Sequence, residues 1–319
     1  MHFQFSSIFV GLDVSKRFLD VCVLGPFAPR RWRVAQQPEA LRALAAELAA
    51  LDAERIIVEA TGKYEDAIVE ALADLGAPIV VMNPKRVRDF AKSLGLLAKT
   101  DTIDAYVLAL YGARIQPVVR ALPSAEQREL ADLTAYQQKI VADRAALKIQ
   151  LQRATLDRIQ QSLLHRIEQL DTECRQIEAE IDNRIAGCQQ WLERAKLARS
   201  APGVGVQVAR TLVAEMPELG AMSDREAAAL AGLAPYASDS GEHHGRRHIR
   251  GGRKRVRRML YLAARTAVRV DLGYAAQYSR MQARGKAKNA ALIAIARKLL
   301  IALNHMFLEN RPFETRLVA

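Results

Sequence analysis

Residues 8–25 read IFVGLDVSKRFLDVCVLG, and residues 30–36 continue with RRWRVAQ. These stretches contain three short runs rich in Val, Ile, Phe and Leu. The runs are separated by Ser15-Lys16-Arg17 and by a turn at Gly25-Pro26. The pattern predicts three successive antiparallel strands.

Helical and strand patterns alternate after these strands. Apolar residues recur at helical spacing over 38–51 and 64–75, and RIIVEA (55–60) and PIVVMN (78–83) are typical of buried strands. Further helices are expected after Asn83-Pro84 and from Thr100. The resulting order, β-β-β-α-β-α-β, is that of a ribonuclease-H-like mixed sheet. A doubly wound nucleotide-binding domain also alternates, but no glycine-rich phosphate loop follows any strand.

The segment from 124 to 186 contains neither Gly nor Pro and predicts long helices. Its apolar residues recur three and four apart, as in a coiled-coil seam: Leu156, Ile159, Leu163, Ile167, Leu170, Cys174, Ile177 and Ile181. One continuous helix over this segment would be ~90 Å long, which is too long for a small domain to bury its seam. Another helix or a second subunit must therefore cover the seam. A homo-oligomer, dimer or tetramer, is expected through this segment, and a helical hairpin within one chain is the alternative.

Positive charge is concentrated in the last third of the 319 residues. Residues 1–112 carry 13 basic and 14 acidic side chains, 113–199 carry 14 and 12, and 200–319 carry 20 and 9. The formal net charge of +12 therefore comes almost entirely from the C-terminal region, which indicates a polyanionic partner. With 50% apolar residues, a disordered chain is excluded.

The three cysteines, Cys22, Cys174 and Cys188, form no C-x-x-C pair and support neither a disulfide framework nor a zinc ribbon. The apolar stretch 290–308 is interrupted by Arg297 and Lys298, and no secretion signal opens the chain. A cytoplasmic protein without a membrane span is expected.

Four acidic residues fall on separate predicted elements. Strand alternation directs Asp13 to the face opposite Leu12 and Val14, and Glu59 ends a later strand. Asp101 and Asp104 lie three apart at a helix start. If the folded sheet brings the four together, their repulsion needs a divalent cation, and oxygen ligands favour Mg²⁺ or Mn²⁺. The alternative for each acid alone is a helix cap or a solvated carboxylate, which is favoured for Asp101 taken by itself, whereas the joint pattern of four acids favours the metal site.

Two features of the C-terminal region suggest contacts with phosphates. The turn at 202–205, Pro-Gly-Val-Gly, has the spacing of a helix-hairpin-helix, although a tight structural turn explains it equally well. The segment RRHIRGGRKRVRR (246–258) has eight Arg or Lys among 13 residues and no acid, which indicates salt-dependent binding to a phosphate backbone. The expected nucleic-acid-binding residues are Arg246, Arg247, Arg250, Arg253, Lys254, Arg255, Arg257, Arg258, Lys286 and Lys288.

Seven motifs over nearly the whole chain resemble the DEDD transposases of insertion-sequence family 110, relatives of the Piv DNA invertases. They are GLDVSK (11–16), IIVEATGKY (56–64), NPKRVRDFAKSLGLLAKTDTIDAYVLA (83–109), RSAPGVG (199–205), GLAPYASDSG (232–241), RGGRKRVRRMLYLAA (250–264) and RGKAKNAALIAIARKLL (284–300).

The resemblance implies a RuvC-like domain whose D-E-D-D acids are Asp13, Glu59, Asp101 and Asp104, acting as catalytic residues and metal ligands. It implies a nucleophilic serine at Ser240, with Ser238 two residues away, and a phosphoserine link to DNA as intermediate. His243 and His244 are candidates for proton transfer, or are solvated loop residues. No DNA-reading helix is evident, and the resemblance implies that a structured RNA encoded by the element guides target choice.

The expected organisation is a RuvC-like α/β domain (1–112), central coiled-coil helices (113–199) and a mainly helical, basic transposase domain (200–319). The favoured function is a transposase or site-specific recombinase that acts on donor and target DNA. Two alternatives remain: a RuvC-like junction nuclease that uses water without a covalent intermediate, and a non-catalytic nucleic-acid-binding protein.

Overall fold

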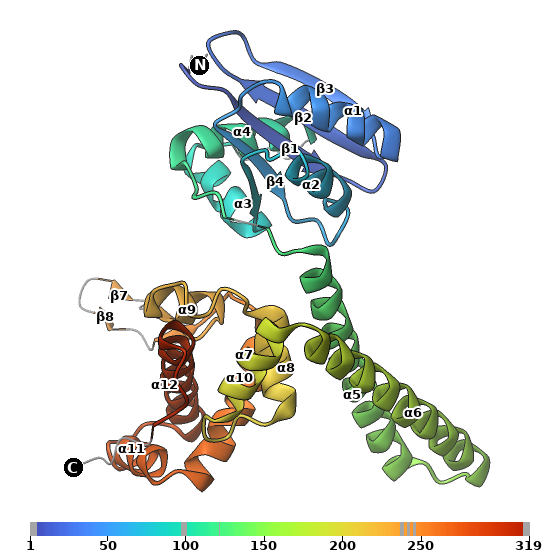
Figure 1. Cartoon of the computed structure of the whole chain (residues 1–319), viewed down its shortest axis with the longest axis vertical. Helices are drawn as coiled ribbons and strands as arrows, with labels where there is room; N and C mark the ends of the chain where they lie inside the picture. The colour runs from blue at the N-terminus through green and yellow to red at the C-terminus, as the bar shows by residue number, and fades with distance from the viewer. Residues whose placement is uncertain are drawn as a thin grey trace. The chain divides into compact units, whose positions relative to one another are not determined.

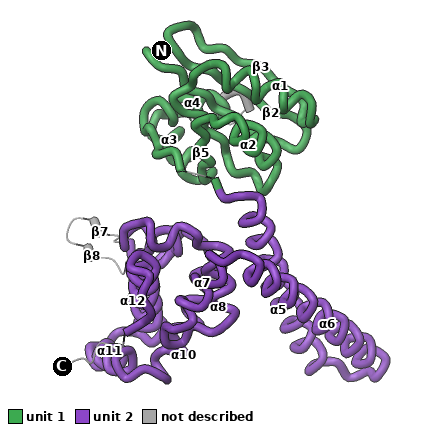
Figure 2. Tube along the Cα trace, viewed as in Figure 1, with its two compact units in different colours: residues 1–122 green, residues 123–319 purple. Residues whose placement is uncertain are grey.

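The structure is a computed structural model that describes residues 5–96, 101–120, 122–236, 239–240, 243–244 and 247–314. For 101–103, 239–240 and 243–244 it describes the backbone. The chain forms two compact units, 1–122 and 123–319 (Figure 2). The central helical segment, expected as a separate part, belongs mostly to the second unit.

The first unit is an α/β domain (Figure 1). In chain order its elements are β1 (Phe9–Val14), β2 (Phe18–Leu24), β3 (Arg30–Ala35), α1 (Pro38–Ala49), β4 (Arg55–Glu59), α2 (Asp66–Ala73), β5 (Ile79–Met82), α3 (Pro84–Ser93) and α4 (Asp101–Ile115).

The five strands form one mixed sheet in the order β3-β2-β1-β4-β5. The pairs β1–β2 and β2–β3 are antiparallel, whereas β1–β4 and β4–β5 are parallel. Helices α1 and α2 share a buried core with one face of the sheet, and α3 and α4 pack on the other. The predicted ribonuclease-H-like sheet is therefore confirmed.

Helix α4 lies unusually close to the central strand because residue 11 has no side chain. A Cβ built on Gly11 would stand 2.1 Å from the carbonyl oxygen of Ala105 and 2.4 Å from the amide nitrogen of Ala109. At the other end of α4, the Arg114 guanidinium lies over the Phe5 ring, 5.5 Å from its centroid. Since Phe5 precedes β1, the helix runs opposite to β1 and its first turn lies toward the end of that strand.

The second unit is mainly helical, as predicted. In chain order its elements are α5 (Ala125–Arg153), α6 (Asp157–Gly187), α7 (Gln189–Arg199), α8 (Val206–Glu215), α9 (Asp224–Leu230), β6 (Pro235–Tyr236), β7 (Asp239–Ser240), β8 (His243–His244), β9 (His248–Ile249), α10 (Lys254–Val270), α11 (Leu272–Ala283) and α12 (Lys288–Glu309).

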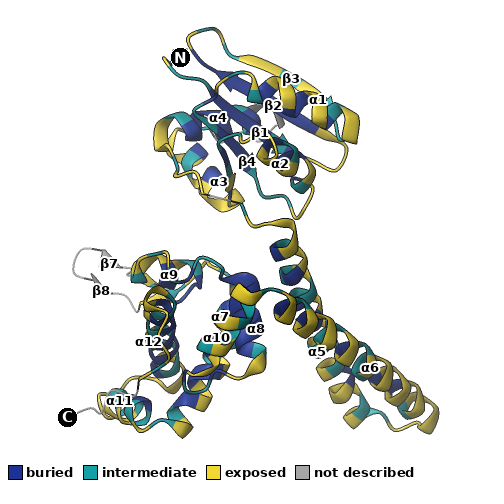
Figure 3. Cartoon of the chain, in the orientation of Figure 1, coloured by how far each residue is buried: buried dark blue, intermediate teal, exposed yellow. Residues whose placement is uncertain are grey.

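The same chain covers the predicted apolar seam from Leu163 to Ile181, whereas Leu156 and Ile159 are exposed. Helices α5 and α6 are joined by residues 154–156 and pack side by side, and both carry buried residues (Figure 3). Leu147, Leu163 and Ile167 form one buried cluster of this helical hairpin. The hairpin alternative therefore describes the chain, and association between chains stays a prediction.

Polar side chains anchor the base of the helical hairpin to α8. Arg210 donates to both carboxylate oxygens of Asp182, at 2.8 and 2.5 Å. Gln127 donates to the carbonyl oxygens of Val213 and Ala214, at 2.9 and 2.7 Å. Gln127 and Arg210 are both buried, whereas the Asp182 carboxylate is exposed, and together these bonds join the hairpin to α8.

Helix α12 is the one helix in the described ranges that is long and apolar enough to cross a membrane. Its buried residues, among them Ile295, Leu299 and Leu303, belong to the core that α8 and α10 also build. The helix therefore serves as a core helix of the second unit.

We expect Gly11→Ala to lower the free energy of unfolding by about 3 kcal/mol or more, because the new methyl group has no room beside the α4 backbone. Urea unfolding followed by circular dichroism measures this. Gly187→Ala is the matched control, since no atom lies within 4 Å of the Cβ it would add. Equal stability of the two variants would contradict the proposed packing of α4.

Candidate functional site

Asp13 lies on the α4 face of the sheet, near the carboxyl end of β1. Val10 and Leu12 are buried in the core on the α1 and α2 side, whereas Gly11 faces α4. Because side chains alternate along a strand, Asp13 shares the face of Gly11. This is the orientation predicted from the sequence.

Glu59 ends the neighbouring parallel strand on the same face. Leu12 pairs with Val58 in the β1–β4 register, so Asp13 and Glu59 follow at the next position. Ile57, two residues before Glu59, contacts Gly112 of α4 and marks this face of β4. Both half-buried carboxylates therefore come from the carboxyl ends of adjacent parallel strands.

The first turn of α4 carries the other two predicted acids. Asp101 opens the helix and Asp104 directly precedes Ala105, whose carbonyl oxygen is the atom nearest to Gly11. With the helix running opposite to β1, its first turn lies toward Asp13. The fold thus brings the elements that carry all four acids to one edge and one face of the sheet.

Carboxylate oxygens are suitable ligands for Mg²⁺ or Mn²⁺. Among the side chains that the structure describes, no three His, Cys, Asp or Glu residues converge closely enough to hold a metal ion. The Asp101 side chain lies outside that description. The carboxylate oxygens suit a divalent cation. The backbone brings together the strands and the helix that carry the four acids, but the described side chains do not converge on one point.

A fifth carboxylate, which the sequence analysis did not single out, lies directly opposite Asp13. The β1–β2 register pairs Asp13 with Asp20, and the β2–β3 register pairs Asp20 with Arg33. Arg33 donates to both oxygens of the buried Asp20, at 3.1 and 2.9 Å. Since like charges opposite each other on a sheet repel, this bidentate pair offsets the charge of Asp20 beside Asp13.

Cys22 also faces α4, next to Asp20 along β2. Burial raises the pKa of the thiol, and this effect is larger than the lowering of the pKa by Arg31. The thiol therefore stays neutral near pH 7 and is a poor nucleophile. All three cysteines are free, as predicted.

Ser240 lies on a short β-hairpin of the second unit. In the antiparallel pair β7–β8, Ser240 is opposite His243 and Asp239 is opposite His244. The structure gives the backbone of these four residues, while Ser238 and Arg246 lie outside the described residues. The register therefore brings one of the two predicted proton-transfer histidines level with the predicted nucleophile.

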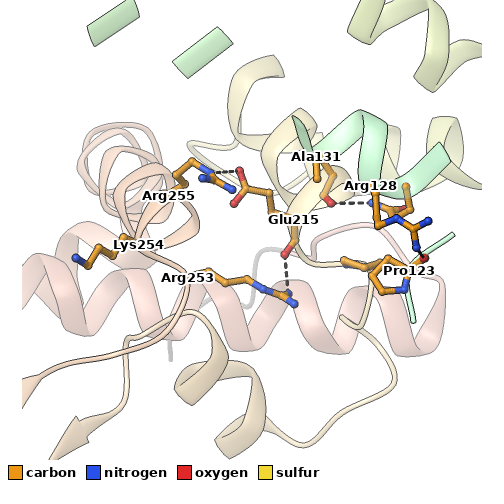
Figure 4. A pocket seen from close by; sticks show the side chains of 10 residues that line it. Pro123, Arg128, Ala131, Glu215, Arg253, Lys254 and Arg255 are labelled. Carbon is orange, nitrogen blue, oxygen red and sulfur yellow. Dashed lines mark hydrogen bonds and ion pairs between the residues drawn. The ribbon is translucent and has the colours of Figure 1, made fainter. Parts of the chain in front are cut away.

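Three arginines of the basic segment bond to the protein itself. Arg253 donates to both carboxylate oxygens of Glu218, at 2.7 and 2.6 Å, and to the Glu215 carbonyl oxygen at 2.6 Å. Arg255 donates to the Glu215 carboxylate at 2.8 Å, and Figure 4 shows both arginines pointing toward Glu215. Arg257 donates to the carbonyl oxygens of Gly232 and Gly251. These three predicted nucleic-acid ligands therefore also hold α10 against its neighbours.

The other predicted basic residues that the structure describes are exposed. Arg250 lies over the Tyr236 ring, 5.0 Å from its centroid. The remaining members that the structure describes are exposed and have no bonded side-chain partner within the described ranges: Arg247, Lys254, Arg258, Lys286 and Lys288. These side chains are free to meet an anionic partner.

The Pro-Gly-Val-Gly turn between α7 and α8 packs against α10. A Cβ on Gly203 would stand 2.2 Å from the Ala263 carbonyl oxygen and 2.6 Å from the Ala267 amide nitrogen. Gly203 also has a φ of +79°. Close backbone packing thus accounts for this glycine, which favours the structural turn over a phosphate-binding one.

Comparison with known families gives two matches along the chain. The model of the DEDD_Tnp_IS110 transposase family matches residues 10–160. The model of the transposase IS116/IS110/IS902 family matches residues 195–299.

Curated relatives match over nearly the whole chain or about half of it. The pilin gene-inverting protein of Moraxella bovis is 28% identical over 98% of this chain and 99% of its own length. An uncharacterized 43.6 kDa protein of insertion element IS110 from Streptomyces coelicolor is 29% identical over 52% of this chain and 40% of its own. Among solved structures, T. thermophilus RuvC in complex with a Holliday junction substrate matches 34% of this chain and 96% of its own, at 18% identity and a TM-score of 0.27.

We expect Arg33→Met to lower the free energy of unfolding by about 1–2 kcal/mol, because it leaves the buried Asp20 carboxylate beside Asp13 without its partner. Adding Asp20→Asn to the same chain should recover part of the loss. Arg30→Met is the control on the same strand, since its ion pair with Glu47 is exposed on both sides. A loss in Arg33→Met no larger than in this control would contradict the role of the pair.

Proposed function

Because the chain belongs to the IS110 family of transposases and is a DNA recombinase, we propose that it cuts and rejoins DNA through a covalent link between Ser240 and a DNA phosphate. The observation that supports this most is the shared edge of β1, β4 and α4, which carries Asp13, Glu59, Asp101 and Asp104. Acids on adjacent parallel strand ends and a facing helix start are positioned to act on one phosphodiester.

The four acids would hold Mg²⁺ or Mn²⁺ as oxygen ligands. When bound, such a cation stabilises negative charge on the attacking oxygen and on the non-bridging oxygens of the scissile phosphate. The Asp20–Arg33 pair contributes by keeping a fifth carboxylate bonded to the protein, which offsets negative charge directly opposite Asp13.

The covalent step exchanges one phosphodiester for another. The Ser240 hydroxyl oxygen attacks phosphorus and loses its proton, and the bond from phosphorus to a DNA 3′ or 5′ oxygen breaks. That oxygen takes up a proton and leaves as a hydroxyl. The position of His243 opposite Ser240 supports His243 as the acceptor of the serine proton. Because the bond energy is conserved, a new DNA hydroxyl can reverse the step and reseal the strand.

Nucleic-acid binding is assigned to the exposed cations of the second unit. Arginine and lysine bind phosphates and read few bases, so choice of sequence needs another component. We assign that part to a structured RNA encoded by the element, which would pair with donor and target DNA. A homo-oligomer, associated through the α5–α6 hairpin, completes the proposed assembly.

The nucleophile is tested by substituting the serine. Ser240→Ala should abolish the covalent protein–DNA adduct, a loss of more than about 100-fold, because no other hydroxyl takes its place. DNA binding should stay within about 2-fold, since one neutral hydroxyl adds little to phosphate affinity. Denaturing gels with labelled DNA measure the adduct, and gel shifts measure binding.

Ser238→Ala is the matched control and should retain the adduct. An adduct that survives in Ser240→Ala would refute the assignment. Cleaved DNA that carries no protein in the unsubstituted chain would instead indicate a nuclease that uses water.

Complementation tests whether acids and serine come from different chains. When Asp13→Asn and Ser240→Ala chains are produced together as dimers, shared sites would leave about a quarter of all sites intact, against none in either variant alone. Strand-transfer assays on the purified mixture measure this recovery. Absence of any recovery in mixed dimers would show that each chain builds its own site.

A further inference from the structure

Helix α10 carries a row of cations on one exposed face. Lys254, Arg258, Arg265 and Arg269 are all exposed, and we call them the α10 stripe. They are spaced four, seven and four residues apart, so they fall within about 60° of the helix circumference at 3.6 residues per turn. The opposite face carries Val256, Leu260, Ala263, Ala264 and Ala267, which are buried in the core.

Two members of the α10 stripe lie beyond the basic segment 246–258. Arg265 and Arg269 are one and two turns further along the helix than Tyr261, in a stretch that reads as apolar. By contrast, Arg255 and Arg257 bond to Glu215, Gly232 and Gly251. The arginines of α10 therefore form two groups, one bonded to the protein and one exposed to solvent.

The start of α12 adds positive charge beside the middle of the stripe. The Tyr261 hydroxyl donates to the Asn289 side-chain oxygen at 3.0 Å, which ties α10 to the first turn of α12. Tyr261 follows Arg258 by three residues and precedes Arg265 by four, so it lies on nearly the same face. Lys288, next to Asn289, and Lys286 are both exposed.

The stretch of sequence that contains α10 and most of α12 has almost no acidic residues to offset its positive charge. Between His243 and Leu308 the one acidic residue is Asp271. Its carboxylate caps α11 by accepting from the Tyr274 amide at 2.8 Å. An exposed helix face usually mixes both signs, and a face of one sign repels itself unless a counter-charged partner lies on it.

We propose that the α10 stripe binds the phosphate backbone of duplex DNA. The bound segment belongs to the same DNA molecule that reacts with Ser240. This rests on the proposed function, because Ser240 fixes which polymer is cut. Strands β6 and β9 pair with each other and close the loop that carries β7 and β8, and Lys254 follows soon after β9. The same loop therefore connects the serine to the beginning of the stripe.

The dimensions of the stripe suit a DNA strand. From Lys254 to Arg269 the helix rises ~22 Å at 1.5 Å per residue, a length along which one strand of B-DNA presents about six phosphates. Each of the four cations can therefore meet its own phosphate. The contacts involve the backbone, so the stripe adds affinity and orientation without a sequence preference.

The test uses Arg265→Gln/Arg269→Gln in the full chain, since both residues lie outside the catalytic elements. At 0.1 M salt we expect duplex DNA to bind roughly 60-fold more weakly, because each of the two phosphate contacts contributes about 8-fold there. The slope of log K against log salt should fall by about 2. Fluorescence anisotropy with a 30-base-pair duplex at several salt concentrations measures both.

Arg158→Gln/Arg199→Gln is the charge-matched control, because both arginines are exposed and lie on α6 and α7. It should keep the affinity and salt slope of the unsubstituted chain. A stripe variant with an unchanged slope, or one that loses affinity for an RNA of equal length but not for DNA, would overturn the proposal. Unchanged thermal unfolding in both variants shows that the fold is intact.

The adduct assay separates this inference from the proposed function. At saturating DNA the stripe variant should still form the Ser240 adduct, since its serine and acids are unchanged. If the unsubstituted chain forms no adduct but its DNA binding still depends on the α10 stripe, the covalent mechanism is wrong, whereas the assignment of DNA binding to the stripe is supported.

Discussion

The contact between Gly11 and the α4 backbone determines where the acids of the first unit lie. Any side chain at residue 11 would overlap Ala105 and Ala109, so the helix reaches β1 closely only because that position is glycine. The close approach brings the first turn of α4 to the end of β1 that carries Asp13. The parallel pairing of β1 with β4 then adds Glu59 at the same level. One backbone contact thus couples three elements that are distant in sequence.

The strands and their order were predictable because each is a local pattern, a short apolar run bounded by a turn. The face of Asp13 followed from the same alternation. The Asp20–Arg33 pair was not predictable, because it depends on the register of two hairpins, and a shift by one residue would separate the two side chains. A helical hairpin was one of the two alternatives, but the position of its break at 154–156 was not predictable, since no Gly or Pro marks it.

Composition located the basic region but could not divide its charges by role. Eight cations in 13 residues suggested one binding surface. In the structure Arg253 and Arg255 offset the buried Glu215 and the partly buried Glu218, where an unpaired carboxylate would be costly. Their removal would therefore weaken DNA binding indirectly, by loosening α10. Arg265 and Arg269, which the sequence places among apolar residues, are exposed because helical periodicity sets them opposite the core.

A continuous set of polar contacts runs from the α5–α6 hairpin to α10. Arg210 bonds α8 to Asp182 of α6, and Arg255 of α10 bonds to Glu215 at the end of α8. The hairpin and the α10 stripe are therefore parts of one unit, with α8 between them. Apolar side chains remain exposed near the far end of the hairpin, among them Leu156 and Leu164. Association of two chains through that end would bring their two stripes into one assembly, because α8 bonds to both the hairpin and α10 within each chain.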